Sequence, residues 1–332
     1  MAIELVALFD QRMEDTFGFF LLNGGLYGAG MKGTIYKVIP ASYGYSVEPF
    51  IQLPKTDYLF AISCGDLAIC EREFWSPQKG HFFTWPTSRN SLSASKGRIS
   101  IFSFSEESRY SSILLSSGGG FEVIAELPSR YSFVRNSDFL VEHASKEHYE
   151  ICRLDGFSLS AVARIPSRDC LIVNSIYCGD LFFVYEDGFV TRIDGNGFVE
   201  DIKLKDYLPK SKGDYTLGAC GNAGESSAYF CLGASFSKEI YILVYDSITK
   251  QFELLGPLAK DIGSFLDFAF LGEYIFTTVH HRITAYDRTT CAVRWEAPRQ
   301  SRFCKFFSVV SEKDILVTGI SSGAHMSHLI VT

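Results

Sequence analysis

The sequence predicts an all-β fold built from repeated units of four short antiparallel strands. The first observation is that short apolar stretches recur along the 332 residues, separated by turn sequences such as Asp187-Gly188 and Gly195-Asn196-Gly197. These turns supply the positive φ angles that tight hairpins need. The second observation is that no long stretch carries apolar residues at positions i, i+3, i+4 and i+7 between helix caps. We therefore expect strands joined by hairpins, and not helices.

Residues 167–209 show the four-stranded unit most clearly. The stretches "CLIVNSIY", "LFFVYE", "FVTRID" and "FVEDIKL" are four predicted strands, joined by "CGD", Asp187-Gly188 and "GNG". The same division applies to residues 17–54, 131–166, 215–258 and 265–298. The third strand of a unit tends to end in an aspartate that can accept a hydrogen bond from its own backbone two residues further on. These aspartates are Asp155, Asp194, Asp246 and Asp287.

Consecutive four-stranded units of about 40 residues with almost no helix are typical of a β-propeller. After Pro298 the chain offers only three strands, "CKFFSVV", "DILVTGI" and "SHLIVT", and "IELVALF" at residues 3–9 can supply the fourth. The N-terminal strand would then close the ring by joining the C-terminal blade, which removes an open sheet edge. We therefore predict a single β-propeller domain over residues 1–332.

The number of blades depends on residues 55–128, which are too many for one ordinary blade and slightly few for two. We predict seven blades with a loop insertion at about residues 74–97. The alternative is eight blades, one of them degenerate.

One repeat resembles a known group of propellers. In "ITAYDRTTCAVRWEAP" at 283–298, a third strand ends in Asp287, a turn follows, and the fourth strand carries Trp295. This arrangement is similar to the repeat of quinoprotein-like propellers, and "GTIYKVIP" at 33–40 has a similar character. The motifs are short, so the resemblance implies the fold and no particular activity or cofactor.

Composition narrows the class of protein. Hydrophobic residues make up 47% of the chain and charged residues 21%, which excludes a disordered chain. A formal net charge of -7 argues against general nucleic-acid binding, and no window of eighteen uninterrupted apolar residues predicts a membrane span. The nine cysteines form no CxxC pair and lie mostly in apolar stretches. We expect reduced thiols and a cytoplasmic protein, because the N-terminus also lacks the basic start of a secretory signal.

No motif predicts a catalytic, metal or cofactor site. "GISSG" at 319–323 has the letters of a nucleophile elbow, but too few residues follow it to supply the acid and the histidine, so we expect a hairpin there. His325 and His328 are three residues apart in a predicted strand, which places them on opposite faces and not on one metal ion.

Cations follow a proline, or an equivalent corner, at the ends of several fourth strands. In a propeller these links lie on one face and border the central channel, so we predict that the cations point toward one mouth. The alternative is solvated turns in which Asp57, Asp169 and Asp214 neutralise them locally. The predicted binding residues of this kind are Lys55, Arg130, Arg168, Lys212, Arg299 and Arg302.

The predicted insertion at 74–97 would lie over the same face. It carries Trp75, Phe83, Trp85 and Arg89, and exposed aromatic residues with arginine are typical of interface anchors. The alternative is that its aromatic side chains only cover the first two blades.

These features favour a non-enzymatic cytoplasmic propeller that binds a protein, either as a neutralising, immunity-type binder or as an assembly scaffold. The basic loops indicate an acidic partner. The alternative is an enzyme or small-ligand binder with an anionic, phosphorylated or carboxylated substrate at the channel mouth. RNA binding through aromatic stacking is a third, less supported hypothesis.

Overall fold

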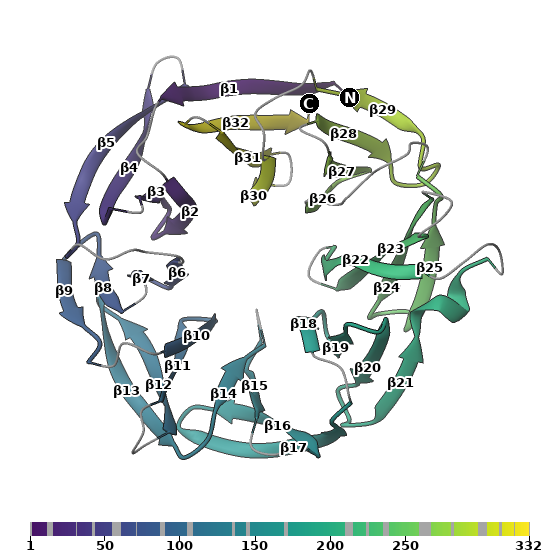
Figure 1. The fold of residues 1–332 in the computed structure, drawn as a ribbon, viewed down its shortest axis with the longest axis horizontal. Helices are drawn as coiled ribbons and strands as arrows, with labels where there is room; N and C mark the ends of the chain where they lie inside the picture. The colour runs from purple at the N-terminus through teal and green to yellow at the C-terminus, as the bar shows by residue number, and fades with distance from the viewer. Residues whose placement is uncertain are drawn as a thin grey trace. The chain divides into compact units, whose positions relative to one another are not determined.

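A computed structural model gives the fold (Figure 1). The chain divides into two compact units, one of residues Met13–Asp169 and one of Met1–Arg12 with Cys170–Thr332. The structure describes residues 2–11, 16–30, 32–41, 44–54, 61–70, 72–86, 90–104, 109–134, 137–143, 147–168, 172–209, 215–223, 226–234, 239–258, 267–279, 282–297, 304–311, 314–321 and 323–331.

The unit of residues 13–169 contains four antiparallel sheets of four strands, each in chain order. The first sheet comprises β2 (Thr16–Leu22), β3 (Gly25–Gly30), β4 (Thr34–Ala41) and β5 (Gly44–Gln52). The second comprises β6 (Ala61–Cys64), β7 (Leu67–Cys70), β8 (Glu73–Ser76) and β9 (Gly80–Thr84). The third comprises β10 (Asn90–Ser95), β11 (Arg98–Phe104), β12 (Arg109–Ser117) and β13 (Gly120–Leu127). The fourth comprises β14 (Tyr131–Phe133), β15 (Phe139–Glu142), β16 (His148–Asp155) and β17 (Ser158–Pro166).

The other unit also contains four such sheets. Three follow chain order, and their strands are β18 (Ile172–Tyr177), β19 (Leu181–Tyr185), β20 (Phe189–Ile193), β21 (Val199–Lys203), β22 (Tyr215–Asn222), β23 (Ser227–Ala234), β24 (Ile240–Asp246), β25 (Gln251–Leu255), β26 (Asp267–Leu271), β27 (Tyr274–Val279), β28 (Arg282–Asp287) and β29 (Val293–Glu296). A short 3-10 helix, η1 (Leu204–Tyr207), follows β21. Within the described part of the chain, no helix is long and apolar enough to span a membrane.

The last sheet joins the two ends of the chain, as the sequence predicts. Its order is β1-β32-β31-β30, with β1 (Ile3–Gln11), β30 (Cys304–Ser311), β31 (Asp314–Ser321) and β32 (Gly323–Val331). The register pairs Ile3 with Val331 and Gln11 with Ala324, so β1 runs antiparallel to the last strand along its whole length. Ser321 pairs with Gly323 where β31 and β32 meet, so Ser321 of "GISSG" lies at the end of a hairpin strand and not on a nucleophile elbow.

The prediction of a loop insertion at residues 74–97 is wrong. This stretch contains most of β8, all of β9 and all of β10, so residues 61–127 form two complete sheets. The strands were hard to predict because β8 has only four residues and Pro77 follows it directly, as in a loop. Eight four-stranded sheets correspond to seven blades plus the closing sheet, or to eight blades when the closing sheet is counted.

The predicted aspartate turns are present in three of the four sheets concerned. Asp194 Oδ1 accepts hydrogen bonds from the backbone N–H of Asn196 and Phe198, at 2.8 and 2.9 Å. Asp246 and Asp287 make the same kind of contact with the second and third residues after them. The backbone N–H of Thr290 and the Arg294 guanidinium lower the pKa of Asp287 to about 2. These carboxylates therefore fix the hairpins between third and fourth strands.

The core lies between successive sheets of each unit. One buried cluster joins the sheets β18–β21 and β22–β25, and the rings of Phe182 and Tyr245 meet there with centroids 4.8 Å apart. In the other unit, Phe74 packs between the sheets β6–β9 and β10–β13, against Phe121 at 4.8 Å. Burial of such aromatic side chains is a large hydrophobic contribution to stability.

Candidate functional site

The predicted aromatic anchors are mostly core residues. Trp75 is fully buried on β8, and its ring lies edge-on to Tyr27 at 5.5 Å. Trp85 is 7% exposed, stacks on Phe74 and donates a hydrogen bond from Nε1 to Ser103 Oγ at 2.9 Å. The prediction that Trp75 and Trp85 present themselves to a partner is therefore corrected, because both fill the space between sheets.

Phe83 differs from the two tryptophans. It lies on β9, and 37% of its surface is exposed, although its ring still contacts Phe74 and Phe121. Of the residues named in the predicted insertion, Phe83 is thus the aromatic one that reaches solvent. Arg89 lies outside the described residues.

Two of the predicted channel cations are described. Arg130 is exposed between β13 and β14, where its guanidinium lies 5.8 Å from the centroid of the Phe102 ring. Arg168 follows β17 and is half-buried. Lys55, Lys212, Arg299 and Arg302 lie outside the described residues. The basic mouth therefore stays a prediction.

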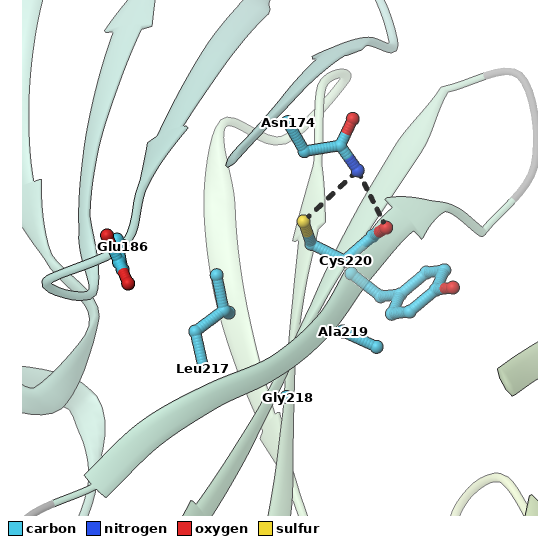
Figure 2. Close-up of a pocket in the computed structure, with 7 residues that line it drawn as sticks. Asn174, Glu186, Leu217, Gly218, Ala219 and Cys220 are labelled. Atoms are coloured by element: carbon cyan, nitrogen blue, oxygen red, sulfur yellow. Dashed lines mark hydrogen bonds between the residues drawn. The ribbon is translucent and has the colours of Figure 1, made fainter. Parts of the chain in front are cut away.

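A cavity of about 340 Å³ lies between β18 and the neighbouring strands β22 and β23 (Figure 2). Strands β18 and β22 are the first strands of successive sheets and contact each other directly. Glu186 reaches the cavity from the turn after β19, and Tyr229 reaches it from β23. The lining residues are Asn174, Glu186, Leu217, Gly218, Ala219, Cys220 and Tyr229.

Two β-bulges shape this cavity. The pairing of β18 with β19 shifts between Ile172 and Asn174, and the pairing of β22 with β23 shifts between Leu217 and Ala219. Gly218 is therefore the extra residue in its strand. A bulge leaves one residue out of the hydrogen-bond ladder and changes the direction of the side chains beside it, and bulges are over-represented next to functional sites. Asn174 and Leu217, which lie beside the two bulges, both line the cavity.

Two asparagine amides hold β18 and β22 together at the cavity. Asn174 Nδ2 donates to the carbonyl oxygen of Cys220 at 3.2 Å and to its Sγ at 3.3 Å (Figure 2). In the opposite direction, Asn222 Nδ2 donates to the carbonyl oxygen of Tyr177 at 2.6 Å. Asn174 Oδ1 also accepts a hydrogen bond from the backbone N–H of Ser175. Each strand thus donates a side-chain hydrogen bond to a backbone carbonyl of the other. These bonds hold β18 and β22 at a fixed separation beside the cavity.

Among the lining residues that the structure describes, one is charged, Glu186. Glu186 is exposed, and among the residues that the structure describes its carboxylate has no hydrogen-bond or ion-pair partner. Burial raises the pKa of the Cys220 thiol, although the hydrogen bond from Asn174 opposes this, so the thiol stays neutral at physiological pH. The cavity therefore offers one carboxylate, a neutral thiol and apolar side chains, which suits a cationic group better than an anion.

Sequence reasoning missed this cavity. Its one local signal is a glycine inside a strand pattern, Gly218 in "YTLGACG", which indicates a bulge or a close approach of another group. Asn174, Glu186 and Tyr229 come together because two sheets pack against each other. No sequence motif indicates this packing.

In both units a Cys-Gly-Asp sequence lies in the hairpin between the first two strands of a sheet and contacts the following sheet. Gly65 and Gly179 have φ angles of 62° and 101° and lie against a serine hydroxyl of the following sheet. The aspartate that follows each glycine bonds to that sheet's last hairpin. Asp66 accepts from Ser116 Oγ at 2.5 Å and from the backbone N–H of Gly119. Asp180 accepts from Tyr245 and Lys250.

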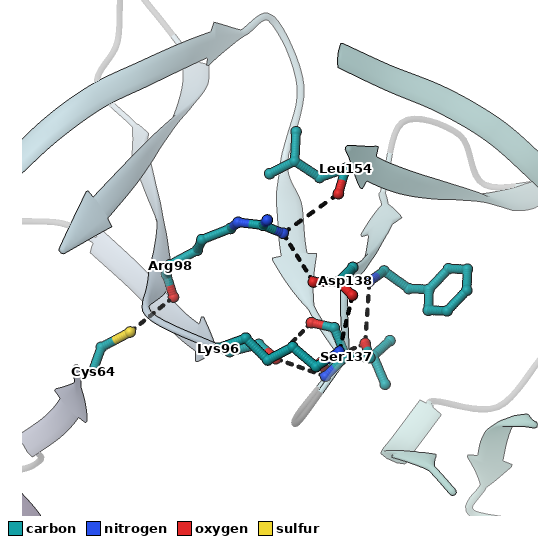
Figure 3. Close-up of polar contacts among 9 residues, drawn as sticks. Cys64, Lys96, Arg98, Ser137, Asp138 and Leu154 are labelled. Atoms are coloured by element: carbon teal, nitrogen blue, oxygen red, sulfur yellow. Dashed lines mark hydrogen bonds and ion pairs between the residues drawn. The ribbon is translucent and has the colours of Figure 1, made fainter. Parts of the chain in front are cut away.

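A further polar contact joins the sheets β10–β13 and β14–β17 (Figure 3). Lys96 Nζ and Arg98 Nη1 lie 2.9 and 3.0 Å from the two carboxylate oxygens of Asp138. Nearby, Ser95 Oγ donates to the carbonyl oxygen of Ser137 and accepts from its N–H, both at 2.7 Å. The ion pairs neutralise Asp138, and the serine bonds satisfy the backbone N–H and carbonyl of Ser137. We therefore interpret these contacts as structural. In the described ranges, no group of three or more His, Cys, Asp or Glu side chains could hold a metal ion.

The chain is similar in structure to solved β-propellers. Saccharomyces cerevisiae Sqt1 matches it with a TM-score of 0.63 and 9% identity over 98% of each chain. YCF48 bound to D1 peptide matches with a TM-score of 0.53 and 13% identity, over 99% of this chain and 97% of that one. BamB from Moraxella catarrhalis matches with a TM-score of 0.57 and 10% identity, over 98% and 99%. No protein-family model and no curated protein sequence matches the chain. The chain therefore has a β-propeller fold, and no specific family is identified.

Proposed function

We propose that this propeller binds a partner protein by capturing an extended segment of it at the cavity between β18 and β22. The observation that carries the proposal is the cavity itself, which two bulges open at the first strands of successive sheets. In a propeller these strands lie next to the central channel. One of the similar propellers, YCF48, was solved bound to D1 peptide, which supports peptide binding as the kind of function proposed here.

The biological role that we propose is that of a neutralising binder or an assembly scaffold in the cytoplasm. The exposed Phe83 and Arg130 would add contacts outside the cavity. The positive charges of Arg130 and Arg168 favour an acidic partner. The cavity does not favour one, because the charged residue among its described lining residues is Glu186. For the same reason we do not carry forward an anionic small-molecule substrate.

A peptide selection tests this function. Random linear peptides displayed on phage are selected against the immobilised full chain, and the enriched peptides are synthesised and titrated by calorimetry. We expect Leu217→Ala to weaken their binding at least tenfold, because Leu217 forms the apolar wall of the cavity. Asp206→Asn is the control, since Asp206 is an exposed carboxylate on η1 outside the cavity. Thermal melting of both variants separates lost binding from lost folding. Failure to enrich any peptide, or equal binding by Leu217→Ala, would contradict the proposal.

A further inference from the structure

Glu186 is exposed and is the charged residue among the described residues that line the cavity. Several acidic side chains of the unit have a cationic partner: Asp180 pairs with Lys250, Glu200 with Arg192 and Asp287 with Arg294. Glu186 lines the cavity between β18 and β22 and has no such partner among the described residues. We propose that this cavity is a subsite for a single basic side chain, lysine or arginine, of the bound segment. This inference rests on the proposed function.

Charge is the first argument for a basic occupant. Glu186 is the one charged residue among the described lining residues, and the next residue, Asp187, adds a second negative charge to the same turn. Asp187 Oδ1 accepts a hydrogen bond from the backbone N–H of Phe189 at 3.1 Å, which holds that carboxylate in the turn. No cation among the described residues pairs with Glu186, so its carboxylate can pair with a cation of the bound segment. A hydrogen bond to a charged group contributes more than one between neutral groups.

The apolar part of the lining is the second argument. Leu217 lies between Glu186 and Cys220 in Figure 2, and Ala219 lies beyond it. A lysine or arginine side chain can pack its methylene groups on such a surface while its charged head reaches a carboxylate. The volume of about 340 Å³ is near the lower limit for small-molecule sites, so the cavity suits one side chain better than a large cofactor.

The backbone supplies the remaining contacts. Gly218 is the bulged residue of β22, is exposed and lines the cavity. A bulged residue lies outside the regular ladder, so its peptide group is available to a ligand. The amide of Asn174 is already engaged with Cys220 and Ser175, so it positions the wall and does not compete for the cation.

The selected peptides provide the test. We expect them to share a lysine or arginine, and we expect its replacement by norleucine or citrulline to weaken binding at least tenfold. Glu186→Gln should weaken the parent peptide to a similar extent and should not weaken the neutral peptide further. Asp206→Asn, the same kind of change on η1, should leave both affinities unchanged.

A charge reversal makes the test specific. Binding of Glu186→Lys to the parent peptide should be lost, and a peptide with glutamate at the basic position should recover it. The subsite would be overturned by peptides that need Leu217 for binding but carry no basic residue, or by peptides whose affinity Glu186→Gln does not change. Either result would leave the proposed function standing. Absence of any peptide binding would overturn both.

Discussion

The hydroxyl of Tyr245 donates a hydrogen bond of 2.5 Å to the carboxylate of Asp180, which joins two successive sheets. Asp180 is 1% exposed, and Lys250 Nζ lies 2.7 Å from its other oxygen. Burial, and then the bond to Asp180, raises the pKa of Tyr245 well above its ordinary value. The tyrosine therefore stays protonated at neutral pH and can donate this hydrogen bond.

Tyr245→Phe is expected to lower the free energy of unfolding by about 1–3 kcal/mol, because it removes a donor from a buried carboxylate. Urea denaturation followed by tryptophan fluorescence measures this. The control is Tyr207→Phe, since Tyr207 is 43% exposed and its ring packs on Phe252 without a described hydrogen bond. We expect that variant to change stability by less than about 0.5 kcal/mol. Equal effects of the two changes would argue against a stabilising role for the Asp180–Tyr245 bond.

Gly179→Ala is expected to destabilise the protein more than Gly188→Ala. Both glycines have a positive φ, at 101° and 79°, so both variants acquire backbone strain of about 1–3 kcal/mol. A Cβ at Gly179 would also lie 2.9 Å from Ser247 Oγ, whereas a Cβ at Gly188 would meet open space. Thermal denaturation of the two variants gives the comparison.

Ser247→Gly provides the complementary measurement, because it removes the atoms that the new Cβ would meet. Combined with Gly179→Ala, it should recover part of the lost stability. If the double variant is no more stable than Gly179→Ala alone, steric conflict with Ser247 is not the cause.

Trp75→Ala is expected to unfold the protein or to cost about 3–5 kcal/mol, as for other large truncations in a core. Trp75 is fully buried against the neighbouring sheet, whereas Phe83 is 37% exposed. Phe83→Ala should therefore cost clearly less. Denaturation midpoints of both variants test the assignment, and a Trp75→Ala protein as stable as the parent would restore this tryptophan as a surface anchor.

Because the pKa of His143 is lowered in the folded protein, we expect the protein to lose stability as the pH falls. Burial, and then the charge of Arg130, lowers its pKa from 6.5 to about 4, and its Nε2 lies 2.9 Å from Ser132 Oγ. Between pH 6.5 and 4 the unfolded chain therefore binds a proton that the folded chain does not. Stability rises with pH wherever the unfolded state binds more protons, so His143 contributes a loss as the pH falls through this window.

His143→Gln removes that proton-binding difference and keeps a polar group near Ser132. Urea unfolding at pH 7.5, 6.0 and 5.0 should show a smaller loss of stability on acidification for this variant than for the parent. Arg130→Gln should reduce the loss in part, because it removes the cation that opposes protonation. An unchanged pH dependence in His143→Gln would contradict the assignment.

The elements predicted correctly from the sequence are those whose information is local. Asp194, Asp246 and Asp287 open their hairpins as predicted, because an aspartate side chain bonds its own backbone two or three residues on. Pairing of the N-terminal strand with the last strand could also be predicted, because one strand was missing from the final unit. Each of these inferences needed only a short stretch or a simple repeat.

The features that could not be predicted depend on packing between sheets. Trp75 has the composition of an interface anchor, but the neighbouring sheet around Tyr27 buries it. The four residues of β8 are too few to show an alternating pattern, so residues 74–97 resemble a loop. The cavity residues Asn174 and Cys220 come together only through bulges and through the contact of β18 with β22.

The sheet that pairs β1 with β32 also has a consequence for synthesis of the protein. Strand β1 ends at Gln11 and its partner β32 begins at Gly323, so β1 emerges from the ribosome long before its partner. At ribosomal rates of about 5–20 residues per second, this interval is on the order of tens of seconds. The nascent chain therefore carries an unpaired strand while the other sheets form, and final closure depends on contacts of very large sequence separation, which form slowly. A chain that stalls before β32 would expose this strand edge to other nascent chains and to chaperones.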